Sequence, residues 1–503
     1  MRAGEGSIVS SSVEEYGLFV NGKWVVPPGA GRFETINPTN REPVGSFVAA
    51  RAADVTAAVE AAHKAFPAWR DLPAPRRGQF LRSAARILKE RKAEIGRIVT
   101  REMGKVLPEG LGDVQEAIDF VEYMDGEGRR LLGETVPSEL TSKFCLTVRQ
   151  PKGVVACITP WNFPTAIPNW KIAAALISGN TVVFKPASNT ARCAAEVVKV
   201  YEDAGLPPGV LNLVTGAGGT VGTALVEDPR VRAVSFTGGV ETGRDVYVRG
   251  AQRLKMVHLE LGGKNPQIVM DDANLPLALE GILFGAFGTS GQRCTATSRL
   301  ILQAGIYDRF LEMLVRRLET FRVGDPLDPA TDMGPVASAD QERKILKYIE
   351  IGRREARLVR GGEKLTGGLY DRGFFVAPTI FETRHGTRIS KEEIFGPVLS
   401  VIKVADYAEA VRVANDVDYG LSSSIYTRDV SRAFRAIEDL EAGITYINAP
   451  TIGAEIQLPF GGIKNTGNGG REAGTAAIEE FTEVKTVFVD YSDKLQKAQI
   501  DTA

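Results

Sequence analysis

Residues 153–187 read GVVACITPWNFPTAIPNWKIAAALISGNTVVFKPA, and this stretch predicts the fold class. It holds an apolar run at 154–158, a helical pattern over about 167–177 and a second apolar run at 181–184. Short apolar strands that alternate with helices are typical of a parallel, doubly wound α/β sheet. Because such sheets bind ligands beyond the carboxyl ends of their strands, the polar motifs after the two runs are candidate ligand sites: Thr159-Pro160-Trp161-Asn162 and Lys185-Pro186.

The same alternation continues on both sides of this stretch. Towards the C-terminus we expect strands at 210–214, 233–236, 266–270, 400–404 and 443–447, with helices at about 191–204, 276–287 and 306–321. Towards the N-terminus we expect a helical region over 53–126 and a hairpin around Asn21-Gly22. The remaining expectations are a strand-containing segment at 130–149, an exposed or edge strand at 482–491, and tails at 1–16 and 492–503.

Length and composition exclude several classes of function. A chain of 503 residues predicts two or three domains, and a formal charge of -1 gives no basic field for nucleic acid or anionic lipid. No apolar run reaches the roughly 18 residues that span a membrane. Four cysteines are too few for a disulfide framework, so we expect a reducing, cytoplasmic location. Three scattered histidines argue against a metal site.

Cys294 is the candidate nucleophile. It follows Gly288-Thr289-Ser290-Gly291-Gln292-Arg293, in which glycines permit a tight turn and Arg293 supplies a cation. A nearby cation and a polar, partly open site favour the thiolate, which is the reactive form. The alternative is a buried structural cysteine, since free cysteine is among the most buried residue types.

Four further residues are candidates for chemistry or binding. Glu260 ends an apolar stretch, where a raised pKa suits a general base; the alternative is a salt bridge to Lys264. The Asn162 amide is a candidate donor to an oxyanion, or else a turn residue. Lys185 and Glu393 are candidates for binding ribose, or else solvated charges.

Two glycine-rich segments follow predicted strands, at 216–222 and 237–243. Neither keeps the dinucleotide-binding spacing of glycines, yet each opens on a helix, whose N-terminus is able to hold a pyrophosphate. Taken singly, each segment is a weak indication of phosphate binding.

Over roughly residues 17–490 the sequence closely resembles the NAD(P)-dependent aldehyde dehydrogenase superfamily, nearest to its semialdehyde dehydrogenase branches. The resemblance rests on motifs that stand in family order: Pro160-Trp161-Asn162-Phe163-Pro164, Lys185-Pro186-Ala187, Phe236-Thr237-Gly238, Glu260-Leu261-Gly262-Gly263-Lys264, Gly291-Gln292-Arg293-Cys294, Glu392-Glu393-Ile394-Phe395-Gly396-Pro397 and Pro459-Phe460-Gly461-Gly462.

The resemblance implies an α/β fold in three parts. A Rossmann-like parallel-sheet cofactor domain would comprise residues 1–128 and 152–262, and an α/β catalytic domain residues 263–476. A small β oligomerisation arm, residues 129–151 and 477–503, would pair subunits into a homodimer or homotetramer.

The resemblance also implies residue roles. Cys294 would be the nucleophile, Glu260 the general base, and Asn162 with the Cys294 backbone N–H the oxyanion hole. Lys185 would hold the adenine ribose, and Glu393 the nicotinamide ribose, with Phe395 beside the nicotinamide. The other residues expected to bind cofactor are Thr159, Pro160, Trp161, Ser188, Gly238, Gly239 and Gly243.

The sequence departs from the common family pattern at two positions. Gly239 stands where a serine often helps to hold the pyrophosphate, and Ser188 stands where a glutamate often receives the ribose 2′-hydroxyl of NAD. Ser188 carries no charge to repel a 2′-phosphate, so NAD is the first expectation and NADP the alternative.

The implied substrate is an aldehyde, and we expect a carboxylate-bearing semialdehyde. The Arg293 fork suits a carboxylate, unless the arginine is structural. Glu116, Arg293 and the loop at 450–455 are similar to α-aminoadipic semialdehyde dehydrogenases, whereas Lys185-Pro186-Ala187-Ser188 resembles glutamate- and 2-oxoglutarate-semialdehyde dehydrogenases. The residues expected to bind substrate are Glu116, Phe163, Arg293, Gly453 and Ala454.

Other functions remain open at this point. One is a broad-specificity dehydrogenase of aliphatic and aromatic aldehydes. From other classes come a cofactor-independent cysteine hydrolase or thioesterase and a non-catalytic binding protein. A phosphorylating or CoA-acylating relative is the nearest rival, against which Glu260 indicates water as the acyl acceptor.

Overall fold

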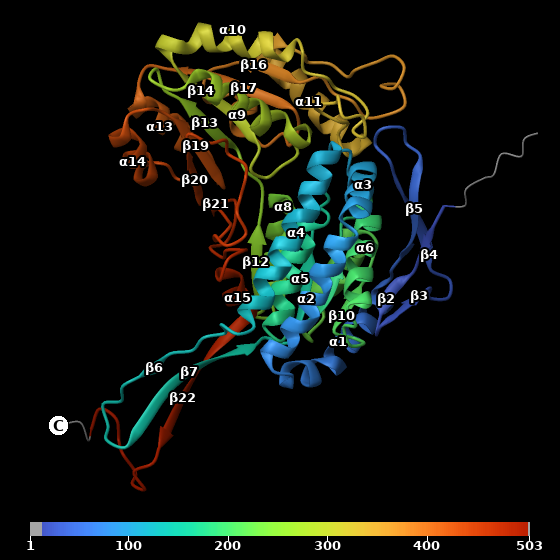
Figure 1. Cartoon of the computed structure of the whole chain (residues 1–503), viewed down its shortest axis with the longest axis vertical. Helices are drawn as coiled ribbons and strands as arrows, with labels where there is room; N and C mark the ends of the chain where they lie inside the picture. The colour runs from blue at the N-terminus through green and yellow to red at the C-terminus, as the bar shows by residue number, and fades with distance from the viewer. Residues whose placement is uncertain (1–12, 501–503) are drawn as a thin grey trace, which may run out of the picture.

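The computed structural model describes residues 13–500, and it is built around two seven-stranded sheets (Figure 1). The first sheet has the order β12-β11-β8-β9-β10-β2-β3. Its five strands from β12 to β10 are parallel, and β2 joins antiparallel through the predicted hairpin. Its strands are β2 (Leu18–Val20), β3 (Lys23–Val25), β8 (Val154–Ile158), β9 (Thr181–Lys185), β10 (Leu211–Leu213), β11 (Val231–Thr237) and β12 (Met256–Glu260).

Helices cover both faces of this sheet, which explains why its strands are continuously apolar. Along β8, Val155 and Cys157 pack in one core and Val154 and Ala156 in the other, as strand alternation requires. The first core takes α2 (Ala74–Glu90), α3 (Lys92–Met103), α4 (Leu107–Glu127), α5 (Ala166–Ile177) and α6 (Ala191–Asp203). The second takes α1 (Ala52–Asp71), α7 (Thr223–Glu227) and α8 (Val240–Ala251).

The second sheet has the order β15-β16-β17-β14-β13-β19-β20 and is parallel except for β15. Its strands are β13 (Asn265–Val269), β14 (Thr297–Gln303), β15 (Arg357–Arg360), β16 (Thr379–Glu382), β17 (Val398–Val404), β19 (Ser422–Tyr426) and β20 (Ile444–Ile447). The helices of this part are α9 (Leu275–Phe287), α10 (Tyr307–Leu318), α11 (Ala339–Glu355), α12 (Arg388–Lys391), α13 (Tyr407–Asn415) and α14 (Val430–Asp439).

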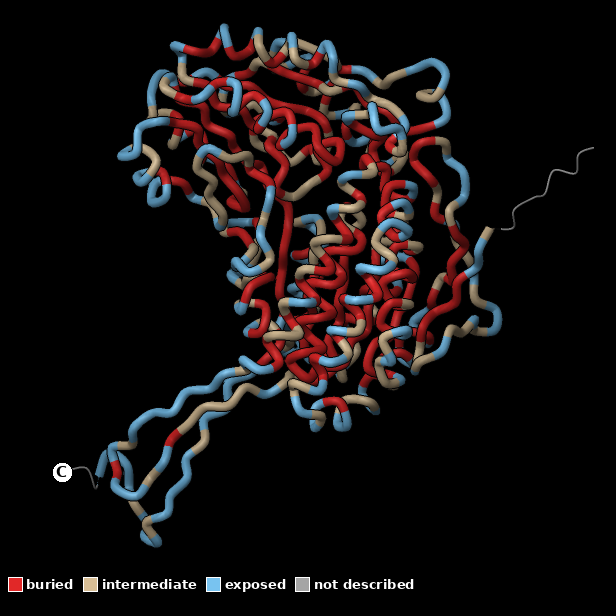
Figure 2. Tube along the Cα trace, viewed as in Figure 1, coloured by how far each residue is buried: buried red, intermediate tan, exposed pale blue. Residues whose placement is uncertain are grey.

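A three-stranded sheet of order β22-β7-β6 projects from the body of the molecule (Figure 1) and is largely exposed (Figure 2). It consists of β6 (Thr135–Val136), β7 (Lys143–Pro151) and β22 (Thr482–Asp490). β22 pairs antiparallel with β7, from Thr482 opposite Pro151 to Asp490 opposite Lys143. The other small elements are β1 (Glu15–Tyr16), β4 (Gly31–Ile36), β5 (Pro43–Ala49), β18 (Tyr419–Gly420), β21 (Ile463–Lys464) and α15 (Ala476–Phe481).

The predicted α/β class, hairpin, helical region and alternating strands are confirmed. The prediction of a tail at 1–16 is wrong at its end, because Glu15 and Tyr16 form β1 beside β5. The rest of that tail, residues 1–12, lies outside the described residues, as do residues 501–503 of the C-terminal tail. Within the described residues, no helix has the length and apolarity needed to cross a membrane.

Candidate active site

Cys294 lies in the loop between α9 and β14, and its backbone is fixed from both sides. Before it, Thr289 (φ 53°) and Ser290 (φ 54°) take the left-handed conformation, which is uncommon for residues other than glycine. After it, the Asn265 side chain donates to the carbonyls of Cys294 (2.8 Å) and Ala296 (2.9 Å). The thiol is half-buried, unlike those of the three other cysteines, which are buried.

Cys294 separates two chambers, since it lines both of them. One, of about 660 Å³, is bordered by Asn162, Glu393 and Phe395. The other, of about 670 Å³, is bordered by Glu260. An aldehyde carbon placed at the sulfur is therefore accessible from both chambers.

The second chamber brings together every residue expected to bind substrate. Its lining includes Glu116, Phe163, Arg293, Gly453 and Ala454. The sequence did not indicate its aromatic walls, Trp170 and Phe460, whose rings meet edge to face at 5.1 Å. We call this space the substrate chamber.

The first chamber adjoins an open cleft of about 1340 Å³ along the carboxyl ends of β8, β9 and β11. Both glycine-rich segments border this cleft, through Gly218, Gly219 and Gly222 and through Gly238 and Gly239. Of the other expected cofactor residues, it is lined by Thr159, Pro160, Trp161 and Lys185.

Four cofactor candidates do not line this cleft, and one of them, Phe395, borders the first chamber. Glu393 accepts a hydrogen bond from the Gly263 backbone N–H at 2.9 Å, in the first chamber. Ser188 follows a cleft residue, and its hydroxyl donates to the Gly216 carbonyl at 3.1 Å. Gly243 is not among the lining residues; a Cβ there would lie 2.5 Å from a Leu261 methyl, so it serves close packing of α8.

The cleft fits a dinucleotide. A Cβ built on Gly218, Gly219 or Gly239 would meet no atom within 4 Å, so a ligand is able to approach the backbone there. The Thr159 and Thr237 hydroxyls are buried without hydrogen-bond partners among the described residues. Lys185 is buried, which lowers its pKa to about 8, and within the described residues its ammonium donates only to the Pro186 carbonyl, at 2.8 Å. The alternative of a solvated Lys185 is thereby wrong.

Glu260 lies in a buried cluster of charged groups. Burial is the main reason that its pKa is raised to about 7, and the nearby His258 imidazole opposes this rise. His258 Nε2 is 3.4 Å from Glu260 and 3.9 Å from carboxylate oxygens of both Glu472 and Glu480. The Lys171 ammonium bonds Glu472, so a cation already occupies the space among these groups.

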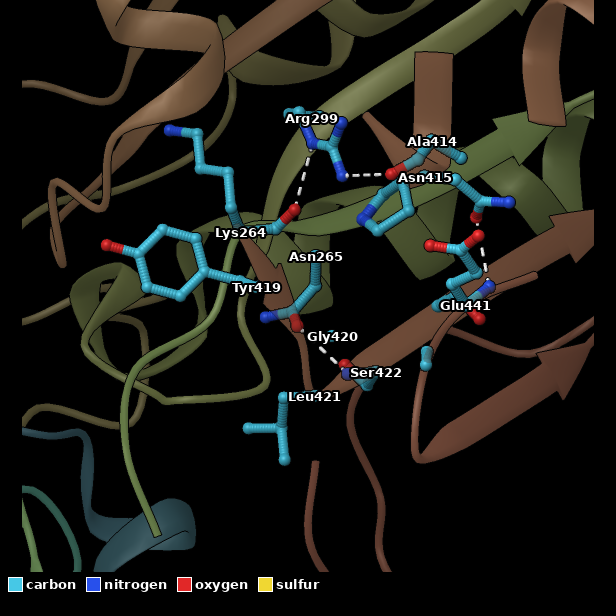
Figure 3. A pocket seen from close by; sticks show the side chains of 13 residues that line it. Lys264, Asn265, Arg299, Ala414, Asn415, Tyr419, Gly420, Leu421, Ser422 and Glu441 are labelled. Carbon is cyan, nitrogen blue, oxygen red and sulfur yellow. Dashed lines mark hydrogen bonds between the residues drawn. The ribbon is translucent and has the colours of Figure 1, made fainter. Parts of the chain in front are cut away.

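The predicted alternative for Glu260, a salt bridge to Lys264, is wrong. The Lys264 ammonium has no hydrogen-bond partner within residues 13–500, and burial lowers its pKa to about 7. In Figure 3 the Lys264 side chain points away from Arg299, whose guanidinium donates instead to the Lys264 carbonyl at 2.8 Å. Arg299 also donates to the carbonyls of Val413 and Ala414, and so anchors the segment after Glu260 to α13.

The expectation that Arg293 makes Cys294 a thiolate is also wrong. Arg293 Nη2 donates to Glu109 at 2.8 Å, which compensates its charge. Burial, followed by the Glu260 and Glu393 carboxylates, raises the pKa of Cys294 to about 12. In this structure the thiol therefore needs a base for activation, and Glu260 borders the same chamber.

The sequence and the structure of the chain were compared with those of known proteins. The model of the aldehyde dehydrogenase family matches residues 24–487. The chain belongs to the aldehyde dehydrogenase family. Among its relatives, the alpha-ketoglutaric semialdehyde dehydrogenase of Bacillus subtilis is 46% identical, over 94% of this chain and 97% of the relative. The NADP(+)-linked succinate-semialdehyde dehydrogenase of Escherichia coli is 40% identical, over 93% and 96%.

Solved structures agree with this membership. The betaine aldehyde dehydrogenase of Staphylococcus aureus, in complex with NAD+, has a TM-score of 0.93 and 34% identity, over 95% of each chain. The protein is an NAD(P)-dependent aldehyde dehydrogenase, as the sequence predicted.

Sequence reasoning on this aldehyde dehydrogenase missed residues that approach the site from distant segments. They are Glu109 on α4, Lys171 on α5, His258 on β12, and Glu472 and Glu480 near the C-terminus. Only His258 carried a local signal, as it stands two residues from Glu260 on the same face of a strand.

Proposed function

We propose that the protein oxidises a carboxylate-bearing semialdehyde to the dicarboxylic acid, through a thioester on Cys294. The position of Cys294 carries this proposal: the sulfur lies between a chamber with Asn162 and Glu393 and a chamber with Arg293. A cofactor-independent hydrolase would have no use for the first chamber and its adjoining cleft.

The chemistry assigned to the residues begins with the Cys294 proton, which Glu260 removes directly or through water. The sulfur then attacks the aldehyde carbon, and the Asn162 amide and the Cys294 backbone N–H donate to the oxyanion. NAD(P), when bound in the cleft, supplies a hydride acceptor, and loss of hydride leaves a thioester. Glu260 then gives up the Cys294 proton to bulk solvent and takes a second proton from the water that adds to the thioester carbon. That proton passes to the departing Cys294 sulfur as the C–S bond breaks, which releases the acid and the thiol.

The substrate class follows from the charges in the substrate chamber. Arg293 donates through Nε to Thr289 and through Nη2 to Glu109, and Nη1 has no partner among the described residues. Burial raises the pKa of Glu116 to about 8, so its neutral form is available at neutral pH to donate to a carboxylate or oxo group. The named activities of the two semialdehyde relatives support a substrate such as α-ketoglutaric semialdehyde.

An amino-acid semialdehyde, such as that of α-aminoadipate, is the second candidate. Glu116 favours this second candidate if the ammonium group of the substrate keeps the Glu116 carboxylate ionised. The two candidates differ in pH dependence. KM for an oxo acid should rise as pH passes about 8, because ionised Glu116 repels the carboxylate, whereas KM for the amino acid should not.

We further infer the assembly and cofactor preference. Residues 129–151 and 477–503 form an oligomerisation arm for a dimer or tetramer, and exposed Val484 and Phe488 on β22 support this role. Residues 1–128 with 152–262 form the cofactor domain, and 263–476 the catalytic domain.

NAD is the preferred cofactor, with NADP as the alternative. Four cysteines without disulfides support a cytoplasmic location.

A substrate panel tests the proposed function. Reduction of NAD and NADP is followed with α-ketoglutaric, succinic and aminoadipic semialdehydes, hexanal and benzaldehyde. A higher kcat/KM for α-ketoglutaric and succinic semialdehydes than for hexanal and benzaldehyde supports the proposal. Equal kcat/KM values for hexanal and the semialdehyde acids would replace the proposal by a broad aldehyde oxidation. Turnover that survives Cys294→Ala would refute the thioester route.

A further inference from the structure

Glu109, near the start of α4, lies against the loop that precedes Cys294. Its two carboxylate oxygens accept from the Thr289 backbone N–H at 2.9 and 3.0 Å. One of them also accepts from Arg293 Nη2 at 2.8 Å. The Glu109 side chain is only 12% exposed, so water competes little for these bonds.

Thr289 is the central residue of this loop. Its N–H donates to Glu109, its hydroxyl accepts from Arg293 Nε at 2.9 Å, and its carbonyl accepts from the Gln292 backbone and side chain. A β-branched residue rarely adopts φ near +53° unless its surroundings hold it there. Glu109 supplies the only partner of the Thr289 N–H recorded in the described part of the chain.

The remaining contacts of the loop do not hold the Thr289 backbone N–H, which therefore depends on Glu109. Ser290 donates to the carbonyls of Gly334 and Pro335, and the Gln292 side chain accepts from the Ala337 N–H. These contacts hold Ser290 and Gln292 but none of them reaches the Thr289 N–H. On the α4 side, Glu109 stands two helical turns before Glu116 and so joins the wall of the substrate chamber to the nucleophile loop.

We propose that Glu109 is a positioning residue, whose carboxylate holds residues 288–293 in the turn that presents Cys294. The inference rests on the proposed role of Cys294 as nucleophile. Glu109 does not touch the reacting atoms; it acts through Thr289 and Arg293. The quantity it controls is therefore the rate of the chemical steps, and substrate binding depends on it less.

The test compares Glu109→Ala and Glu109→Gln with Glu122→Ala, an exposed control on the same helix. With hexanal, which needs no Arg293, Glu109→Ala should lower kcat by about tenfold to hundredfold, as for a lost charged hydrogen bond, with little change in KM. Glu109→Gln keeps an acceptor at the same reach and should restore most of kcat. Wild-type kcat in Glu109→Ala would overturn the proposal.

Two further variants keep the outcome interpretable. If Glu109→Ala does not fold, Glu109→Asp takes its place: it keeps the charge but shortens the reach, and should be slower than Glu109→Gln. A Glu109→Asp enzyme faster than Glu109→Gln would overturn the positioning role. Cys294→Ala separates the nucleophile role of Cys294 from the positioning role of Glu109. An active Cys294→Ala enzyme would refute the nucleophile role. An inactive Cys294→Ala enzyme together with a fully active Glu109→Ala enzyme would refute only the role of Glu109.

Discussion

His258 Nε2 lies 3.4 Å from Glu260 Oε1, and both side chains are buried. The imidazole abuts Gly470 so closely that a Cβ there would lie 1.9 Å from Nδ1, which fixes the ring in this position. The charged groups that face the pair are Glu472, Glu480 and Lys171. The proximity of the His258 imidazole opposes the rise in the pKa of Glu260 that burial causes.

The pH profile of turnover should therefore depend on His258. Glu260 acts as a base when ionised, so hydrolysis of the thioester should accelerate as pH rises through about 7. In His258→Asn the pKa of Glu260 rises further, and the profile should move to higher pH. The same change at His385, whose imidazole pairs with Asp416 and not with a carboxylate of the Glu260 cluster, is the control. Superimposable profiles for His258→Asn and the wild type would contradict this role.

Asn162 should control kcat. Its side chain is buried and lines the chamber that contains Cys294. Removal of an oxyanion donor costs about 10²–10³ in kcat, so Asn162→Ala should lose that much with a small effect on KM. Asn162→Asp, whose carboxylate accepts where the amide donates, should recover nothing. Steady-state kinetics of both variants decide the matter, and an active Asn162→Asp enzyme would exclude the oxyanion role.

Arg293 should separate acidic from neutral aldehydes. Arg293→Met removes the proposed donor for the substrate carboxylate, and loss of such a bond should raise KM for succinic semialdehyde by about tenfold to hundredfold. Because Arg293 also bonds Glu109 and Thr289, kcat should fall for every substrate. The informative quantity is the ratio of the KM change for succinic semialdehyde to that for hexanal. A ratio near one would remove the carboxylate assignment.

Cofactor preference should respond to residue 188. Ser188 is neutral, and its hydroxyl is directed to the Gly216 carbonyl. A glutamate there would repel a 2′-phosphate, so Ser188→Glu should raise the kcat/KM ratio of NAD to NADP by about tenfold or more. Ser188→Gln, of equal size without the charge, is the matched control. An equal shift in both variants would assign the effect to size.

Arg299 should be a stability residue. It is fully buried, and its guanidinium donates to the carbonyls of Lys264, Val413 and Ala414. Arg299→Met leaves these three acceptors without donors, which should lower the free energy of unfolding by about 3–5 kcal/mol. Arg435→Met, at an exposed position, should leave it nearly unchanged. Thermal unfolding followed by circular dichroism provides the comparison.

The local sequence pattern was sufficient to predict the parallel sheets and the candidate ligand-binding residues at the ends of their strands. Asn162 comes soon after β8 and Lys185 ends β9, and the common direction of parallel strands brings such ends to one edge of the sheet. For the same reason, both glycine-rich segments could be assigned to candidate phosphate contacts before their common cleft was known.

The electrostatics of the site could not be predicted from local pattern. Arg293 is adjacent to Cys294 in the chain, but its charge is compensated by Glu109, nearly two hundred residues earlier. Proximity in sequence left a salt bridge from Glu260 to Lys264 open as an alternative, whereas the fold surrounds Glu260 with His258 and Glu472. Burial and long-range ion pairs set the pKa of a group, and neither is encoded in the adjoining residues.

The surroundings of Glu260 have a consequence for folding of the chain. Glu472 and Glu480 follow Glu260 by more than two hundred residues, and the strand β22 after them pairs with β7 more than three hundred residues earlier. Contacts between such distant segments form late, because the entropy of closing the intervening loop has to be overcome first. A partly folded molecule therefore holds Cys294 before the surroundings of Glu260 are complete.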